Sequence, residues 1–186
     1  MAVSAVAAPT RVTLAEFQRM DLDDHAELIL GQIHEPMPES LRHLKAAWRL
    51  ARSLEALYPE QWVVRDASLP IPEDGEPRPD TIVFKQAFDA YPDLGVYDAR
   101  DVLLVAEVCL SSHHCDYELK EIQYALGYIP EYWIIDLDKN LVEVRTEPQR
   151  WGYARRAVYE PGETVNGLSV AELLGPDPEK PSQPNG

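Results

Sequence analysis

Two acidic residues and one lysine have the chemical character of a hydrolytic site. Asp80 lies at the start of the predicted strand 79–84, and Glu107 is the one acid in the apolar run 102–108. A carboxylate among apolar neighbours is unfavourable unless it is paired or binds a metal. Two carboxylates on neighbouring strands can hold Mg²⁺ or Mn²⁺, which prefer oxygen ligands. Lys120 follows on the next predicted helix and could reach the same edge of the sheet.

These three side chains could activate a water molecule against a phosphodiester. The metal would take up charge on the phosphate and lower the pKa of the water, and the lysine would stabilise or relay charge. An ion pair between Lys120 and either acid, with a purely structural role, accounts for the same residues on spacing alone. The residues therefore leave both a nuclease-type metal site and a structural ion pair open.

A strand, a helix and a second strand within residues 101–136 must position these side chains. The apolar run 102–108 is typical of a strand buried on both faces. Residues 132–135 are rich in aromatic and β-branched side chains, which favours a second strand. Between them, the pattern predicts a polar loop at 111–115 and a helix at 116–127.

The two faces of this helix differ in character. Asp116 is expected to be its N-cap. Leu119, Ile122 and Leu126 fall on one face, which we expect to pack on the sheet, and Lys120 falls on another. Lys120 would then overhang the sheet edge.

The remaining segments predict the other elements of one domain. A capping box, T-L-A-E, begins a short helix at residues 13–20, and a longer helix runs from Ser40 to Tyr58. Its apolar face is predicted to carry Leu44, Trp48, Ala51 and Leu54. Further strands are predicted at 27–35 with a turn at Gly31, at 62–71, and at 141–145 and 153–159 as a C-terminal β-hairpin; residues 169–174 form a short helix.

Composition places the chain among globular proteins. With 186 residues and 45% hydrophobic residues, we expect one domain at 13–174, a flexible arm at 1–12 and a disordered, Pro-rich tail at 175–186. The two cysteines form no disulfide framework, and no export signal or membrane-spanning run is evident, so we expect a cytoplasmic protein.

The formal net charge of −15 excludes a globally basic nucleic-acid surface. A local basic stripe remains on the helix that begins after Ser40, formed by Arg42, Lys45, Arg49 and Arg52. Such a stripe is typical of a solvated helix face. The alternative interpretation is a set of contacts to the phosphates of DNA.

One cluster of cysteines and histidines and one separate histidine are candidate metal ligands. Cys109, His113, His114 and Cys115 could suggest zinc, but a closed structural site needs four ligands of suitable geometry and the sequence holds no second cluster. His43 lies between the apolar and polar faces of its helix, which favours a partly buried histidine over a metal ligand.

An ordered set of motifs resembles a known family. The residues that carry the resemblance are Glu27-Leu28, Gly31, Ile33, His43, Glu76-Pro77-Arg78-Pro79-Asp80, Glu107-Val108, Ser111, Ser112, Asp116, Lys120, Tyr124, Gly127, Tyr132, Trp133 and Asp136. In this order they resemble the PD-(D/E)XK nuclease superfamily, and within it the restriction endonuclease-like domains of bacterial genomes. The match covers about residues 13–174, and the ordered set is more specific than any single piece.

The resemblance implies a fold and a metal site. It implies an α/β (α+β) fold, a restriction-endonuclease-like core with a mixed sheet and flanking helices. It implies that Asp80, Glu107 and the backbone carbonyl of Val108 bind the metal, and that Glu27 reaches the same metal from the N-terminal segment. Cys109 stands where the superfamily motif has a lysine. In the branch that this chain resembles, the lysine lies on the following helix instead, and Lys120 matches that position.

The resemblance also implies an activity. We expect an Mg²⁺-dependent endonuclease that hydrolyses DNA, with Asp80, Glu107 and Lys120 as catalytic residues and Glu27, His43 and Tyr124 as accessory residues. A two-fold homodimer would make cutting both strands easier. The loop 110–115 lacks the proline and the basic residues usual in the family, and with the net charge this favours the alternative, a catalytically silent binding or assembly module.

Overall fold

The computed structural model describes residues 11–35, 38–71, 75–91, 97–110 and 112–176. Most of the predicted arm and tail lies outside the described residues. Within the described part of the chain, every helix is too short or too polar to cross a lipid bilayer.

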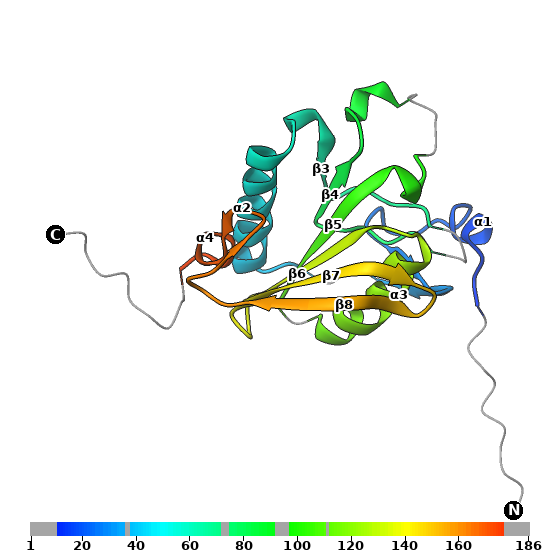
Figure 1. Ribbon diagram of the computed structural model, residues 1–186. Helices are drawn as coiled ribbons and strands as arrows, with labels where there is room; N and C mark the ends of the chain where they lie inside the picture. Colours follow the sequence, from blue (N-terminus) through cyan, green and yellow to red (C-terminus); the bar gives the residue numbers. More distant parts are fainter. Residues whose placement is uncertain (1–10, 36–37, 72–74, 92–96, 111, 177–186) are drawn as a thin grey trace, which may run out of the picture.

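A mixed sheet of six strands forms the centre of the described fold (Figure 1). The strands lie in the order β3-β4-β5-β6-β7-β8, and neighbouring strands are antiparallel except for the parallel pair β5 and β6. Their bounds are β3 Val63–Arg65, β4 Thr81–Phe84, β5 Val102–Cys109, β6 Glu131–Asp136, β7 Leu141–Gln149 and β8 Gly152–Tyr159. The predicted mixed α/β fold and its C-terminal hairpin, β7 with β8, are confirmed.

Helices cover both faces of this sheet. The long helix α2 (Leu41–Leu57) and the short α4 (Val170–Leu174) share one core cluster with Leu104, Ala106 and Val108 of β5. The other face packs with Tyr124 of α3 (Lys120–Leu126). Because side chains alternate along a strand, Glu107 of β5 points to the face that α3 covers.

Smaller elements complete the described fold. They are α1 Leu14–Phe17, the hairpin β1 Glu27–Ile29 with β2 Gln32–His34, the 3₁₀ turns Glu60–Trp62, Phe88–Ala90 and Ala99–Asp101, the π-helix Cys115–Leu119, and the ladder β9 Thr164–Val165 with β10 Leu168–Ser169. The predicted capping box of α1 is confirmed by reciprocal hydrogen bonds between Thr13 and Glu16. The predicted strand 62–71 is wrong beyond Arg65, because Asp66 adopts a φ of 47° and the ladder ends there.

The helix after β5 packs on the sheet through the face opposite to the predicted one. Lys120 and Tyr124 are buried with Gln123, whereas Leu119 and Ile122 are only half-buried. The predicted packing face is therefore wrong. The reason is Glu107, since a buried carboxylate requires polar partners from the helix above it. The predicted N-cap is also wrong.

The residue predicted as that N-cap, Asp116, lies inside the π-helix Cys115–Leu119. Its carboxylate accepts a hydrogen bond from the Ser112 hydroxyl, and its backbone N–H donates to the Ser112 carbonyl at 2.9 Å. The helical segment thus begins before Asp116. A π-helix widens one turn by an extra residue, and Lys120 is the first residue after it.

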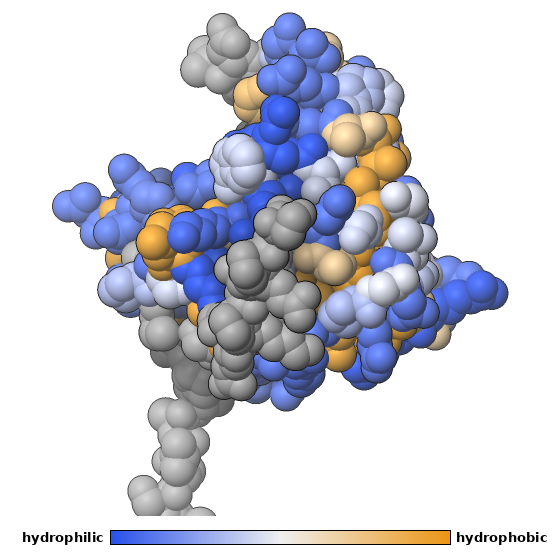
Figure 2. Space-filling view, turned by 90° about the vertical axis from the view of Figure 1, so that its left-hand side faces the viewer, coloured by the Kyte–Doolittle hydropathy of each residue, from blue (hydrophilic) through white to orange (hydrophobic). Residues whose placement is uncertain are grey.

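The packing face of α2 is also rotated from the prediction. Leu44 and Trp48, predicted to be core residues, are 48% and 59% exposed, and Leu41 is 65% exposed. Ala51 and Leu54, also predicted to be core residues, are fully buried, and Ala46 and Leu50 are buried with them. Leucines stand on both sides of this helix, so periodicity did not decide its orientation. The side of the molecule that carries α2 and α4 accordingly shows apolar surface among hydrophilic residues (Figure 2).

Candidate active site

The register of β4 and β5 brings the two predicted catalytic acids together. Thr81 pairs with Ala106 in this antiparallel ladder. Extending the register by one residue places Asp80 opposite Glu107, and opposed residues share a face of the sheet. The backbone N–H of Val108 donates to Asp80 Oδ2 at 2.7 Å. The short polar side chain of Asp80 is therefore fixed beside the strand that carries Glu107.

Lys120 joins Glu107 to the N-terminal hairpin. Its Nζ lies 2.9 Å from Glu107 Oε1 and 3.0 Å from Glu27 Oε1. The Tyr124 hydroxyl, one helical turn later, donates to the same oxygen of Glu107. Lys120 is only 5% exposed. The structure thus brings Glu27, Glu107, Lys120 and Tyr124 into one polar cluster beneath α3.

Burial and charge shift the pKa values of this cluster. Burial raises the pKa of the Glu107 carboxyl to about 8, and Lys120 opposes this shift while Asp80 adds to it. Burial alone would lower the pKa of Lys120, but the surrounding carboxylates, first Glu107 and then Glu27, hold it well above its usual value. We therefore expect Lys120 to stay protonated. The ionisation of Glu107 depends on the charges next to its carboxyl group, which are Lys120 on one side and Asp80 on the other.

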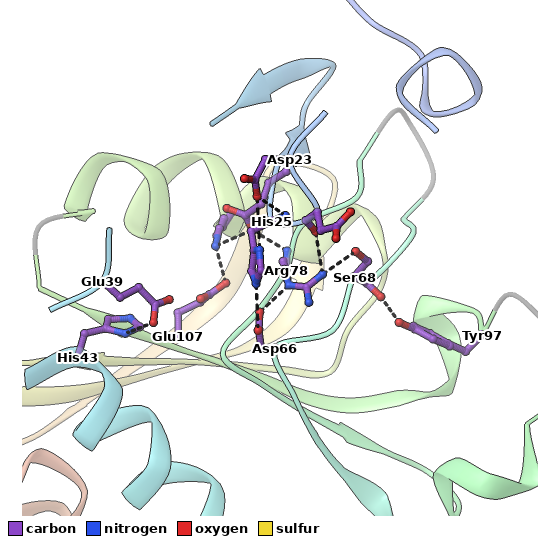
Figure 3. Close-up of polar contacts among 12 residues, drawn as sticks. Asp23, His25, Glu39, His43, Asp66, Ser68, Arg78, Tyr97 and Glu107 are labelled. Carbon is purple, nitrogen blue, oxygen red and sulfur yellow. Dashed lines mark hydrogen bonds and ion pairs between the residues drawn. The ribbon is translucent and has the colours of Figure 1, made fainter. Parts of the chain in front are cut away.

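Arg78 fastens the hairpin that supplies Glu27. The backbone N–H of Arg78 donates to Glu27 Oε1 at 2.6 Å, and its guanidinium contacts the Asp66 carboxylate at 2.5 Å. The guanidinium also donates to the Asp24 carbonyl at 3.2 Å, and Figure 3 shows it between Asp66 and Ser68. Glu27 is thereby held from two sides, by Arg78 and by Lys120. Arg78 belongs to the motif 76–80, but no role for it was predicted from the sequence.

His43 and Glu39 reach the same site from the beginning of α2. His43 Nε2 lies 3.4 Å from Asp80 Oδ2. Glu39 Oε2 lies 3.5 Å from His43 Nδ1 (Figure 3). Burial alone would lower the pKa of His43, but Asp80, followed by Glu39 and Glu107, raises it to about 9. Glu39 was not predicted as a site residue; its spacing of four residues from His43, at the start of a helix, is the signal that could have identified it.

The donor set is suited to a divalent cation. Ligand atoms of Glu39, His43 and Asp80 all lie within 4.8 Å of one another. His43 Nδ1 is buried without a hydrogen-bond partner among the described residues. With the oxygens of Glu107 opposite Asp80, the cluster offers mainly carboxylate ligands, which Mg²⁺ and Mn²⁺ prefer.

The predicted basic stripe lies away from this cluster. His43 faces the sheet, whereas the stripe lies on the other side of α2. Arg42 donates to the Leu137 carbonyl at 2.7 Å, and Arg49 donates to the Leu174 carbonyl at 2.7 Å. Arg52 pairs with Glu55 at 2.8 Å; Lys45 is exposed and has no recorded partner within the described ranges. Two of the four cations thus serve the protein's own backbone.

Lys45 and Arg52 are consequently the two stripe residues best able to contact DNA phosphates. If they do, changing both to glutamine should lower the slope of log affinity for DNA against log salt by roughly one unit per lost contact. Fluorescence anisotropy at several salt concentrations measures this slope. Arg155→Gln, an exposed cation on β8, is the control and should leave it unchanged. A slope unaffected by the double change would mark the stripe as a solvated face.

Comparison with known proteins supplies a family. Residues 14–174 match the model of the Uma2 family, which is described as "putative restriction endonuclease". The chain is also similar to a crystal structure from Anabaena variabilis described as a putative nuclease. The TM-score is 0.67 and the identity 19%, over 88% of this chain and 97% of that chain. At this identity the likeness shows a shared fold. No curated protein matches the chain.

Proposed function

The chain belongs to the Uma2 family of putative restriction endonucleases, and from this we propose that it hydrolyses DNA phosphodiester bonds with Mg²⁺ or Mn²⁺. The observation that supports the proposal most is the position of Lys120, buried between the carboxylates of Glu107 and Glu27. Asp80 lies across the strand pair from Glu107. Carboxylates around one buried cation, beside the interior strands β4 and β5, are groups that can support metal-assisted phosphodiester hydrolysis.

The metal would be held by Asp80 and Glu107, with His43 and Glu39 close enough to contribute. A bound Mg²⁺ would neutralise charge on the phosphate and lower the pKa of a water molecule. The pKa of His43, about 9, means that its proton competes with a cation, so metal affinity should rise with pH. The Val108 carbonyl remains a proposed ligand; the recorded contact of this residue is the N–H that orients Asp80.

The chain's own residues have distinct tasks in this proposal. Lys120 opposes the rise in the pKa of Glu107 that burial causes, contacts Glu27, and stabilises negative charge that develops on an oxygen beside Glu107. Tyr124 orients Glu107 through its hydroxyl, and Arg78 holds Glu27 in place. A homodimer with two-fold symmetry would present two such sites to the two strands of a duplex.

Cleavage of supercoiled plasmid DNA tests the proposal directly. The purified full-length protein should nick the plasmid in Mg²⁺ or Mn²⁺ and should stop doing so when the metal is chelated. Glu107→Gln keeps the shape of the side chain and should abolish nicking. Nicking that persists equally in Glu107→Gln would indicate a contaminating nuclease, and its absence in wild type at all metal concentrations would refute the activity.

The metal site has its own test. Asp80→Asn removes a negative ligand, so calorimetric titration with Mn²⁺ should show binding to wild type and a large loss of affinity in the variant. The expected loss is at least about 10-fold, since even outer partners of a metal site contribute 10–100-fold. Asp89→Asn, on an exposed 3₁₀ turn, serves as the control. Equal binding by the wild-type and Asp80→Asn proteins would exclude Asp80 as a ligand.

A binding or assembly module is the second candidate function. The observation that favours it is the outward face of α2, where Leu41, Leu44 and Trp48 are exposed and neighbouring arginines bind the protein's own carbonyls. The net charge of −15 also disfavours tight DNA binding. In that case the plasmid assay gives no cleavage, although the protein binds metal.

A further inference from the structure

A second group of metal-binding side chains lies at the ends of β5 and β6. Cys109 ends β5 and Asp136 ends β6, and the parallel register pairs these two residues directly. His113 follows Cys109 by a short connection and reaches back over the strand ends. One ligand atom from each of the three residues lies within 4.8 Å of the others, and His113 Nε2 is 3.3 Å from Asp136 Oδ2.

We propose that Cys109, His113 and Asp136 form a second metal site, selective for a divalent transition metal such as Zn²⁺. A thiolate, an imidazole and a carboxylate are the ligands that zinc takes, whereas Mg²⁺ avoids sulfur. Ligands of a tetrahedral zinc ion stand roughly 3.4–3.7 Å apart, from bond lengths of about 2.0–2.3 Å. Binding would therefore draw the three atoms together by up to about 1 Å. The Cys109 thiol would release its proton to solvent.

The surroundings of Asp136 already orient this site. The backbone N–H groups of Asp138 and Lys139 donate to its Oδ1, at 3.1 and 2.7 Å, and the Tyr117 hydroxyl donates to its Oδ2 at 2.7 Å. Such outer contacts fix a carboxylate for metal binding. The Lys139 ammonium, 3.2 Å from Oδ2, occupies the place of a cation, but its side chain is 49% exposed and can swing into solvent.

This site is distinct from the proposed Mg²⁺ site. The two share no ligand, since Asp80, Glu107, Glu39 and His43 belong to the first and none of them to the second. Cys109 lies two residues beyond Glu107 on the same strand and the same face. A filled second site would tie His113, just before the π-helix, to the strand ends. It would thus hold in place the segment that carries Lys120.

Cobalt binding tests the proposal, because a cobalt–thiolate bond gives an ultraviolet charge-transfer absorption. Titrating Co²⁺ into the reduced, full-length protein should produce this absorption at one equivalent per chain. Zn²⁺ should remove it, and excess Mg²⁺ should not. Cys109→Ser should abolish it, whereas Cys115→Ser, the chain's other cysteine, should leave it intact. His113→Ala should weaken Zn²⁺ binding by at least about 100-fold.

His114→Ala is the matched control for the histidine, since His114 is exposed and faces Glu118. Circular dichroism checks that each variant is folded, and His113→Ala, at a half-exposed position, keeps the test valid if Cys109→Ser unfolds. The Asp80→Asn protein should retain the absorption, which separates this site from the proposed nuclease site. No absorption in wild type, or an absorption that survives Cys109→Ser or His113→Ala, would overturn the proposal.

Discussion

Replacing Lys120 by methionine is expected to lower the rate of DNA cleavage by about 10²–10⁴-fold, the range for losing one proton-transfer or charge-stabilising group. Lys120 Nζ contacts both Glu107 and Glu27, so methionine removes the charge that both carboxylates share. Burial raises the pKa of Glu107 and Lys120 opposes that rise, so the variant should have a still higher Glu107 pKa and a more fully protonated carboxyl. Single-turnover nicking of plasmid DNA measures the rate.

The controls for this variant separate chemistry from folding. Thermal denaturation should show that the Lys120→Met protein is folded at the assay temperature. Lys85→Met removes an exposed lysine at the end of β4 and should cut DNA at the wild-type rate. A folded Lys120→Met protein that cuts as fast as wild type would exclude Lys120 as the catalytic cation.

The second large effect concerns stability rather than cleavage. Arg145 of β7 is 4% exposed, and its Nε lies 2.7 Å from Oε1 of Glu143, which is fully buried. Arg145 also donates to the Tyr117 carbonyl at 3.0 Å and pairs with Glu121, so it joins β7 to the helical segment above the sheet. Arg145→Met should lower the free energy of unfolding by about 3–5 kcal/mol, because it removes the buried partner of a buried carboxylate. Urea denaturation measures the change.

A double change shows whether the lost pair is the cause. Arg145→Met combined with Glu143→Leu removes both charges and should recover much of the lost stability. Arg156 also lies 2.5 Å from Glu143 Oε2, but its side chain is 60% exposed, so it should offset only part of the loss of the buried Arg145. Arg155→Met, at a surface pair with Glu147, should change stability little. An Arg145→Met protein as stable as the Arg155→Met control would contradict the prediction.

Strand patterns in the sequence predicted the centre of the fold well. The run 102–108 reads as a strand buried on both faces, and β5 is that strand, with the fully buried Tyr132 and Trp133 on its neighbour β6. Such a run is informative because its length suits a strand and is short for a helix. The packing faces of the helices were harder to predict. The helix α2 carries leucines on both its buried and its exposed side, so the apolar pattern alone did not show which side packs on the sheet.

The site was predictable in its residue types but not in its contacts. Asp80, Glu107 and Lys120 stand out as charges among apolar neighbours, and the structure brings them together. The contact of His43 with Asp80 depends on where the start of α2 lies relative to β4, a relation between distant segments that no local pattern contains. The buried face of α3 was predicted wrongly because hydrophobic periodicity places apolar residues against the sheet. Here the buried carboxylate of Glu107 requires polar partners, which Lys120 and Tyr124 supply.

The π-helix before Lys120 makes the site sensitive to the length of the chain. Each residue of an α-helix turns the side chains by roughly 100°, and the wide turn Cys115–Leu119 accommodates one residue more than an α-helical turn would. Losing a single residue there would regularise the helix and rotate either Lys120 or the Ser112–Asp116 contact out of place. Substitutions in this segment are therefore expected to be tolerated far better than insertions or deletions, which would change the geometry of the site without touching any of its side chains.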